Sequence, residues 1–210
     1  MPFMTPAAAL LSRAPERPRP EAALLPGIAL ALGRVHEACG RARRSFAAWL
    51  AGRCEGPVLW IAPGWAAEDL NPEGLLRFAA PERFLFAAPR RAEDVLWCAE
   101  EALRAGCVAL VVAELPALPG LTPVRRLQLA AEAGAAEAGP VPAGLLLTPG
   151  AGGARGVETR WRMEPDHAPG RTAWRLERLR ARQDPPRAWR VEDGAAGLAA
   201  RPAPQGEDGD

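Results

Sequence analysis

Short apolar runs alternate with longer amphipathic segments through the middle of the 210-residue chain. Short continuous runs between turn residues are typical of strands that are buried on both faces of a sheet. The segments between them repeat their apolar residues every three or four positions, which predicts helices. An apolar stretch predicts one or two strands at 28–38, and further buried strands are expected at 56–64, 82–89, 107–115 and 143–150.

The expected helices cover residues 43–54, 71–79, 91–106 and 122–134. Asn71 followed by Pro72, and Thr122 followed by Pro123, are typical of helix N-termini, and Gly106 is typical of a C-terminus. Strands and helices that alternate at this spacing are joined by right-handed crossovers, which produce parallel strand pairs. The fold class is therefore α/β, with a mainly parallel sheet flanked by helices.

The last third of the chain follows a different pattern, because apolar and charged residues alternate along it. This period of two predicts strands at 156–165, 171–182 and 187–192. The sequence QDPP at 183–186 is typical of a turn. We therefore expect C-terminal antiparallel strands at one edge of the sheet.

The two ends of the chain differ in composition from the middle. Residues 1–26 are rich in proline and alanine, and we expect a poorly ordered N-terminal arm there. Residues 27–192 carry the patterns described above and form the one folded domain that a chain of this length predicts. Residues 193–210 are rich in alanine, glycine and proline and end in acidic residues, so we expect a disordered tail.

The composition excludes every role that requires a lysine. All 26 basic residues are arginine, so no lysine is present to neutralise a terminal phosphate, form a Schiff base or act as a general base. The formal net charge of +1 favours no particular class of partner. The sequence contains neither a run of 18 apolar residues nor the layout of a signal peptide, so we expect a cytoplasmic protein without membrane contact.

The cysteines and histidines do not suggest a metal site. The cysteines lack the paired C-x-x-C spacing of zinc sites, and we expect reduced thiols in or near the core. They are Cys39, Cys54, Cys98 and Cys107. His36 and Glu37 are neighbours in an expected strand, where their side chains point to opposite faces. We therefore expect structural or interfacial roles for this pair, with no metal ligand and no catalytic residue.

Residues 40–47, GRARRSFA, lie where an expected strand leads into an expected helix. P-loop proteins place their phosphate loop at such a junction, with the pattern G-x-x-x-x-G-K-S/T. Gly40 matches the first position, but Ser45 stands in place of the second glycine and Phe46 in place of the lysine. Ala47 replaces the residue whose hydroxyl would bind magnesium. The loop is degenerate, and we expect Phe46 to pack against the sheet.

Three charged residues near this loop are candidates for nucleotide chemistry. Arg43 and Arg44 could contact a phosphate, but an arginine does not restore the backbone cradle that the missing glycine allows. Glu114 ends an expected strand, where P-loop proteins place an acid that holds magnesium. Without the lysine and the hydroxyl this acid has little to coordinate, so we expect no cofactor and no catalysis. A solvent-facing arginine cluster is the simpler interpretation, and an ATPase with an atypical arginine-containing loop is the alternative.

Several sequence blocks follow one another in the order and spacing of a known family: RVHEACG, GPVLWIAPGW, EDVLWCAEEALRAG, LTPVRRLQLAAEAG, GVETRWRMEP, WRLERLRAR and PRAWRVE. Over roughly residues 27–192 the chain resembles the ImuA family, which comprises RecA-like proteins of bacterial damage-induced mutagenesis cassettes. The most specific blocks are RRLQLAAE and TRWRM, the latter followed by LERLRAR and a tryptophan. The resemblance implies a RecA-like fold of the P-loop type.

The same resemblance implies an accessory role in SOS-induced, error-prone translesion DNA synthesis. The implied partners are an ImuB-like homologue of Y-family polymerases that is itself inactive, a C-family error-prone DNA polymerase and RecA. The chain departs from RecA at the phosphate loop and lacks segments long enough to form the DNA-binding loops of RecA. We therefore expect an adaptor that keeps the fold without the nucleotide chemistry. A cell-division inhibitor that shares the shortened RecA-like core is a further alternative.

Two stretches are candidates for contact with DNA or a protein partner. The first lies within residues 171–190, where arginines and tryptophans are interleaved as in surfaces that bind a DNA backbone or an acidic protein. Its candidate residues are Trp174, Arg175, Arg178, Arg180, Arg182 and Trp189. The alternative is a hairpin with its tryptophans directed inward and its arginines outward. The second candidate is Arg125 with Arg126, for which the alternative is an ion pair with Glu132 or a neighbour.

Overall fold

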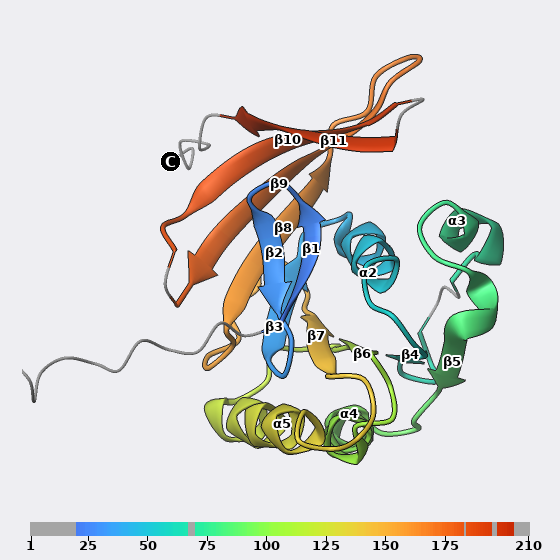
Figure 1. Cartoon of the computed structure of the whole chain (residues 1–210), viewed down its shortest axis with the longest axis vertical. Helices are drawn as coiled ribbons and strands as arrows, with labels where there is room; N and C mark the ends of the chain where they lie inside the picture. Colours follow the sequence, from blue (N-terminus) through green and yellow to red (C-terminus); the bar gives the residue numbers. More distant parts are fainter. Residues whose placement is uncertain (1–19, 67–69, 183, 195–196, 204–210) are drawn as a thin grey trace, which may run out of the picture.

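The computed structural model describes residues 20–66, 70–182, 184–194 and 197–203 (Figure 1). Its strands are β1 (Glu21–Leu25), β2 (Ile28–Ala31), β3 (Val35–Cys39), β4 (Val58–Ile61), β5 (Phe84–Ala87), β6 (Leu110–Glu114), β7 (Ala143–Leu147), β8 (Thr159–Pro165), β9 (Thr172–Ala181), β10 (Arg187–Gly194) and β11 (Gly197–Ala203). Its helices are α2 (Arg43–Ala51), α3 (Pro72–Leu76), α4 (Ala92–Ala105) and α5 (Leu121–Gly134), with a short 3₁₀ helix η1 (Pro81–Arg83).

Most of the described strands form one sheet in the order β11-β10-β9-β8-β3-β7-β6-β4-β5, and β1 pairs with β2 in a separate antiparallel hairpin. The neighbours from β8 to β5 in this order run parallel to one another. Strands β9, β10 and β11 extend the sheet beyond β8 as antiparallel strands. This arrangement confirms the α/β fold class, with a mainly parallel sheet and C-terminal antiparallel strands at one edge.

The sheet is covered on both faces (Figure 1). Helices α4 and α5 pack on one face, in a core that includes Val35, Ile61 and Val111. Helix α2 and the β1–β2 hairpin pack on the other face, in a core that includes Trp60 and Trp161. Because alternate residues of a central strand supply two different cores, the strand reads in the sequence as a continuous apolar run.

Aromatic side chains hold α2 on the sheet. Phe46 is fully buried, as the sequence predicts, and its ring stacks on that of Trp161 with centroids 5.8 Å apart. Trp49 meets the Phe46 ring edge-on at 6.2 Å, and Trp189 of β10 lies 5.9 Å from Trp161. This row of rings joins α2 to β8 and β10, and it fixes the position of the loop between β3 and α2.

The expectations for the two ends of the chain are wrong in part. Residues 20–26 belong to the fold, because β1 buries Ala22 and Leu24 in the core under α2. Strand β11 belongs to it as well, since it pairs with β10 along its whole length. Alanine-rich strands bury small side chains, so their composition resembles that of a disordered segment even where alternate positions are covered. Residues 1–19 and 204–210 lie outside the described residues.

Two smaller expectations are also wrong, and one is confirmed. Helix α5 begins at Leu121 with Gly120 as its N-cap, so Thr122 lies in the first turn and does not cap the helix. Extended backbone at Gly120 allows the chain to enter the helix earlier than the Thr-Pro pair suggests.

Cys107 is exposed, whereas the other three cysteines are buried or partly buried. Asn71 caps α3 as predicted, because its side chain accepts a hydrogen bond from a first-turn N–H at 3.0 Å.

We expect Phe46→Ala to lower the free energy of unfolding by about 3–5 kcal/mol, because it removes a fully buried ring and leaves a cavity between α2 and β8. Denaturation with urea, followed by tryptophan fluorescence, measures this change. The control is Phe86→Ala, which truncates a ring that is 63% exposed. Equal unfolding midpoints for the two variants would show that the Phe46 ring does not hold α2 in place.

Candidate functional site at the carboxyl edge of the sheet

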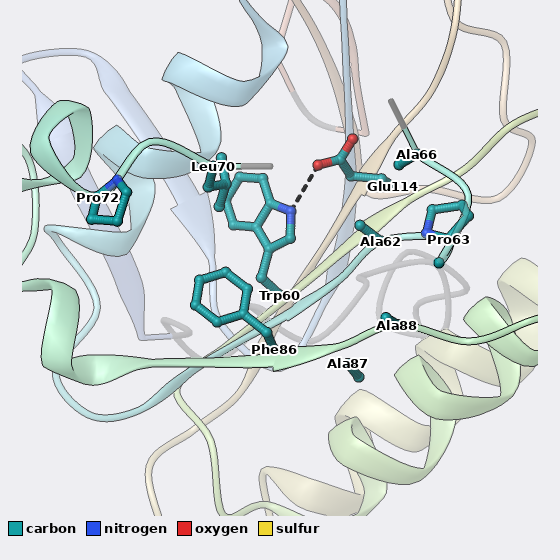
Figure 2. A pocket seen from close by; sticks show the side chains of 11 residues that line it. Trp60, Ala62, Pro63, Ala66, Leu70, Pro72, Phe86, Ala87, Ala88 and Glu114 are labelled. Carbon is teal, nitrogen blue, oxygen red and sulfur yellow. Dashed lines mark hydrogen bonds between the residues drawn. The ribbon is translucent and has the colours of Figure 1, made fainter. Parts of the chain in front are cut away.

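The end of β6 and the start of α2 meet at the carboxyl edge of the parallel strands. Glu114, the last residue of β6, is buried and accepts hydrogen bonds on both carboxylate oxygens. Arg44 donates from Nε and Nη2 to Oε2, at 3.1 and 2.9 Å. Trp60 of β4 donates from Nε1 to Oε1 at 2.8 Å (Figure 2). Arg44 and Trp60 therefore already engage both oxygens of the Glu114 carboxylate. In a P-loop protein, an acid at the end of such a strand holds magnesium.

The backbone of the degenerate loop is also engaged within the protein. The N–H of Arg41 donates to Glu164 Oε1 at 3.3 Å, and the N–H of Ala42 donates to a carbonyl of β8 at 3.0 Å. The N–H of Arg43 donates to the carbonyl of Gly40 at 3.4 Å, and its guanidinium reaches the same carbonyl at 3.1 Å. A phosphate loop needs free N–H groups at these positions to bind its ligand. At these three positions the loop therefore offers no free N–H group to a phosphate.

Gly40 has a structural reason to be glycine. Its φ is +88°, and a Cβ at this position would lie 2.5 Å from the carbonyl oxygen of Met163 in β8. No other residue tolerates both the backbone conformation and the close approach. Ser45 lies partly buried in the first turn of α2. The interpretation of the loop as a solvent-facing arginine cluster is wrong for Arg44, because its guanidinium turns inward to Glu114.

An apolar pocket of about 300 Å³ lies beside Glu114 (Figure 2), the carboxylate that forms the ion pair with Arg44. Its lining includes Trp60, Leu70 and Phe86, and the carboxylate that faces it is that of Glu114. Because Arg44 and Trp60 already hold this carboxylate, the open surface of the pocket is largely apolar. Such a pocket suits an apolar side chain better than a phosphate.

Sequence reasoning missed this pocket because it interpreted residues 82–89 as a strand buried on both faces. That interpretation is wrong, since β5 is the edge strand of the sheet and Leu85 and Phe86 are exposed. An apolar run does not reveal strand order, and an edge strand and a central strand can have the same composition. Exposed apolar residues along an unpaired strand edge are typical of interaction sites.

His36 and Glu37 have the structural roles that the sequence predicts. Both are fully buried in β3, and Glu37 accepts hydrogen bonds from Thr148 Oγ1 at 2.7 Å and Arg160 Nε at 2.5 Å. His36 Nε2 lies 2.8 Å from a backbone carbonyl oxygen, and Nδ1 lies 2.7 Å from the Thr159 hydroxyl. Burial lowers the pKa of His36 to about 4, so its ring is neutral at pH 7.

The basic stretch near the C-terminus does not form the basic and aromatic surface considered from the sequence. Trp174 and Trp189 are buried, as the alternative hairpin interpretation predicts. Arg178 is buried as well, and its guanidinium lies 5.8 Å from the ring of Trp161 and 5.6 Å from that of Trp189. Arg175 forms an ion pair with an acid of the same strand at 3.0 Å. Nucleic-acid bases cannot stack on tryptophans that lie in the core.

Arg180 and Arg182 are exposed, and the fold brings them close to the second candidate. Arg125 of α5 lines the same groove as these two residues, although more than 50 positions separate them in the sequence. Arg126 instead forms an ion pair with Glu100 of α4 at 2.8 Å, which confirms the alternative of a neighbouring acid for this residue. The two stretches considered separately from the sequence thus contribute to one surface.

The part of the chain that the structure describes contains no group of three histidine, cysteine or acidic side chains placed to hold a metal ion. Among the same residues, no helix combines the length and the apolar character needed to cross a membrane. No family model matches the chain, and no curated protein is significantly similar to it. A functional proposal therefore depends on the residues and their arrangement.

We expect Glu114→Gln to lower the free energy of unfolding by about 1–3 kcal/mol, because a neutral amide keeps an acceptor for Trp60 but leaves Arg44 without its charged partner. Urea denaturation measures this difference. The control is Glu101→Gln, which breaks an ion pair between half-exposed side chains on α4 and should change little. Wild-type stability of Glu114→Gln would contradict a structural role for the ion pair.

The buried His36 makes stability depend on pH. Its pKa is about 4 in the folded protein, against 6.5 for a histidine in water, so below pH 6.5 the unfolded chain binds a proton that the folded protein does not. This contribution is complete above pH 6.5 and is lost as the pH falls toward 4. We expect it to remove about 2 kcal/mol between pH 7.5 and pH 5.

Unfolding free energies measured at the two pH values test this expectation. His36→Gln should flatten the dependence on pH, whereas His167→Gln, at an exposed histidine, should retain it. The same slope in His36→Gln and in the wild type would assign the dependence to other groups.

Proposed function

We propose that this chain is a non-catalytic, RecA-like accessory protein of SOS-induced, error-prone translesion DNA synthesis, in which it acts as an adaptor for an ImuB-like polymerase homologue. The observation that carries the non-catalytic part is the ion pair between Arg44 and Glu114. Through this ion pair a residue of the degenerate loop engages the acid that, under this proposal, stands in the position of a magnesium ligand. The internal hydrogen bonds of the loop N–H groups support the same conclusion.

Two features of the fold support a RecA-like core. Strand β3 leads directly into α2 through the degenerate loop, and Glu114 ends β6, which is separated from β3 by the single strand β7. In a P-loop protein, the phosphate loop and the acid that holds magnesium face each other across this edge of the sheet. Arg44 and Glu114 face each other in the same way here. Together with the sequence blocks that resemble the ImuA family, this placement supports a nucleotide-binding fold that has lost its chemistry.

The apolar pocket supports a role in binding another protein. Phe86 and Leu85 are exposed on β5, and the outer edge of this strand has no partner among the described strands. A partner can pair with such an edge through its backbone and place an apolar side chain in the adjacent pocket. We infer that the ImuB-like protein docks here, with the C-family polymerase and RecA as further members of the assembly.

Co-purification of the tagged chain with the ImuB-like protein of the same genome, with and without ATP, tests this function. We expect recovery that does not depend on ATP. Phe86→Asp should abolish recovery, because a charge at the pocket prevents apolar contact. The matched control is Leu129→Asp on α5, at a leucine that is 65% exposed and lies outside the pocket.

Each of the other outcomes contradicts part of the proposal. Recovery only with ATP would favour the ATPase with an arginine-containing loop. Recovery that survives Phe86→Asp would move the docking site away from β5. If neither the wild type nor the control variant recovers the polymerase homologue, the proposed pathway is wrong, and a cell-division partner becomes the alternative to examine.

A further inference from the structure

Arginines from three separate elements line one groove of about 580 Å³ beside α5. Arg125 comes from α5, Arg155 from the loop that precedes β8, and Arg180 from the end of β9. All three side chains belong to exposed residues. We propose that this groove binds the phosphodiester backbone of a nucleic acid. The proposal goes beyond the adaptor function and does not depend on it.

The groove carries an excess of positive charge. Its lining contains five arginines, Arg34, Arg125, Arg155, Arg180 and Arg182, and two acids, Glu132 and Glu158, which leaves a net charge of +3 (five minus two). The whole chain has a net charge of only +1, so the excess is local. A surface of this kind attracts polyanions from solution.

The two acids of the groove form no ion pair with Arg125, Arg155 or Arg180. Arg34 forms an ion pair with Glu132 and lies 3.8 Å from Glu158. Glu158 also lies 4.0 Å from Arg182. Among the described residues, no ion pair involves the three exposed arginines of α5, the loop and β9. Their guanidinium groups are therefore available to an anionic ligand.

The backbone that carries these arginines is fixed by specific contacts. Gln128 of α5 accepts a hydrogen bond from the N–H of Val35 at 3.1 Å and donates to its carbonyl at 3.0 Å. The same amide donates to the carbonyl of Gly156 at 3.2 Å. A Cβ at Gly156 would lie 3.1 Å from Leu121, so the loop that precedes β8 packs closely against the first turn of α5. These contacts fix the backbone positions of Arg125 and Arg155 relative to each other before any ligand binds.

The chemistry of the groove favours phosphate over other anions. A guanidinium presents parallel N–H donors that match two oxygens of a phosphate, and it stays charged at any physiological pH. Three cations on three elements suit a ligand with several successive charges, as a nucleic-acid strand has. The first turn of α5 contains no acidic residue, so the positive end of its dipole is not offset there. Trp174 and Trp189 are buried, so no base of the nucleic acid can stack on them. The groove would therefore contact the sugar-phosphate backbone of the ligand.

Fluorescence anisotropy with a labelled oligonucleotide of about 20 nucleotides, single-stranded or in duplex form, tests the proposal across about 50–200 mM salt. The test variant is Arg125→Ala/Arg155→Ala/Arg180→Ala. We expect its affinity to fall about tenfold or more at the lowest salt concentration. For the single strand, the slope of log K against log salt should become shallower by about 2, since each phosphate contact contributes about 0.7.

The matched control is Arg53→Ala/Arg90→Ala/Arg91→Ala, which removes the same charge from exposed positions outside the groove. It should keep wild-type affinity and slope.

Equal losses in the two triple variants would overturn the proposal in favour of general electrostatic attraction, and absence of binding to both oligonucleotides would also overturn it. Competition by polyglutamate as effective as that by unlabelled DNA would assign the groove to an acidic protein. Phe86→Asp should leave DNA binding unchanged, so failure of the adaptor function and failure of this inference are distinguishable.

Discussion

The burial of Phe46 is the constraint on which the rest of this structure depends. A lysine at this position would direct its charge toward a phosphate, whereas the phenylalanine ring lies in the core in contact with Trp49 and Trp161. That packing draws the start of α2 against β8, where Gly40 comes close to a carbonyl of the strand. The N–H groups of Arg41, Ala42 and Arg43 then find acceptors within the protein. One apolar side chain thus stands where the P-loop pattern has its lysine, and its burial fixes the start of α2.

The ion pair at the carboxyl edge follows from the position of α2. With the helix fixed, the first-turn Arg44 reaches past β7 to Glu114, and the second oxygen of that carboxylate accepts the hydrogen bond of Trp60. A buried charge is tolerated only when it is paired and hydrogen-bonded, and both conditions are met here. The contacts that engage the Glu114 carboxylate are therefore also contacts that stabilise the fold. The neighbouring pocket keeps a largely apolar surface because the Glu114 carboxylate in its lining is already engaged by Arg44 and Trp60.

Features that depend on neighbouring residues could be predicted from the sequence, and features that depend on distant ones could not. The strands, the helices, the degenerate loop and the burial of Phe46 follow from local periodicity and a local motif. The ion pair of Arg44 with Glu114 joins positions 70 residues apart, and no local pattern records it. The edge position of β5 and the common groove of Arg125 and Arg180 depend on strand order, which apolar runs do not encode. The strands at the two ends were missed for a different reason, because alanine-rich strands do not stand out by composition.

Strand order also separates the two proposed interaction sites. The pocket lies at the β5 edge, and the groove lies where α5 meets the end of β9, with five strands between β9 and β5 in the sheet. At about 4.8 Å per strand, roughly 29 Å of hydrogen-bonded sheet connects them. In a protein that hydrolyses a nucleotide, loops at the carboxyl edge change their contacts during each cycle. Here internal hydrogen bonds and the Arg44–Glu114 ion pair connect the loop to β8 and to the end of β6 at that edge. A polymerase homologue at β5 and a nucleic acid at α5 would therefore be joined through one continuous hydrogen-bonded sheet, and the order of its strands sets the distance between the two proposed sites.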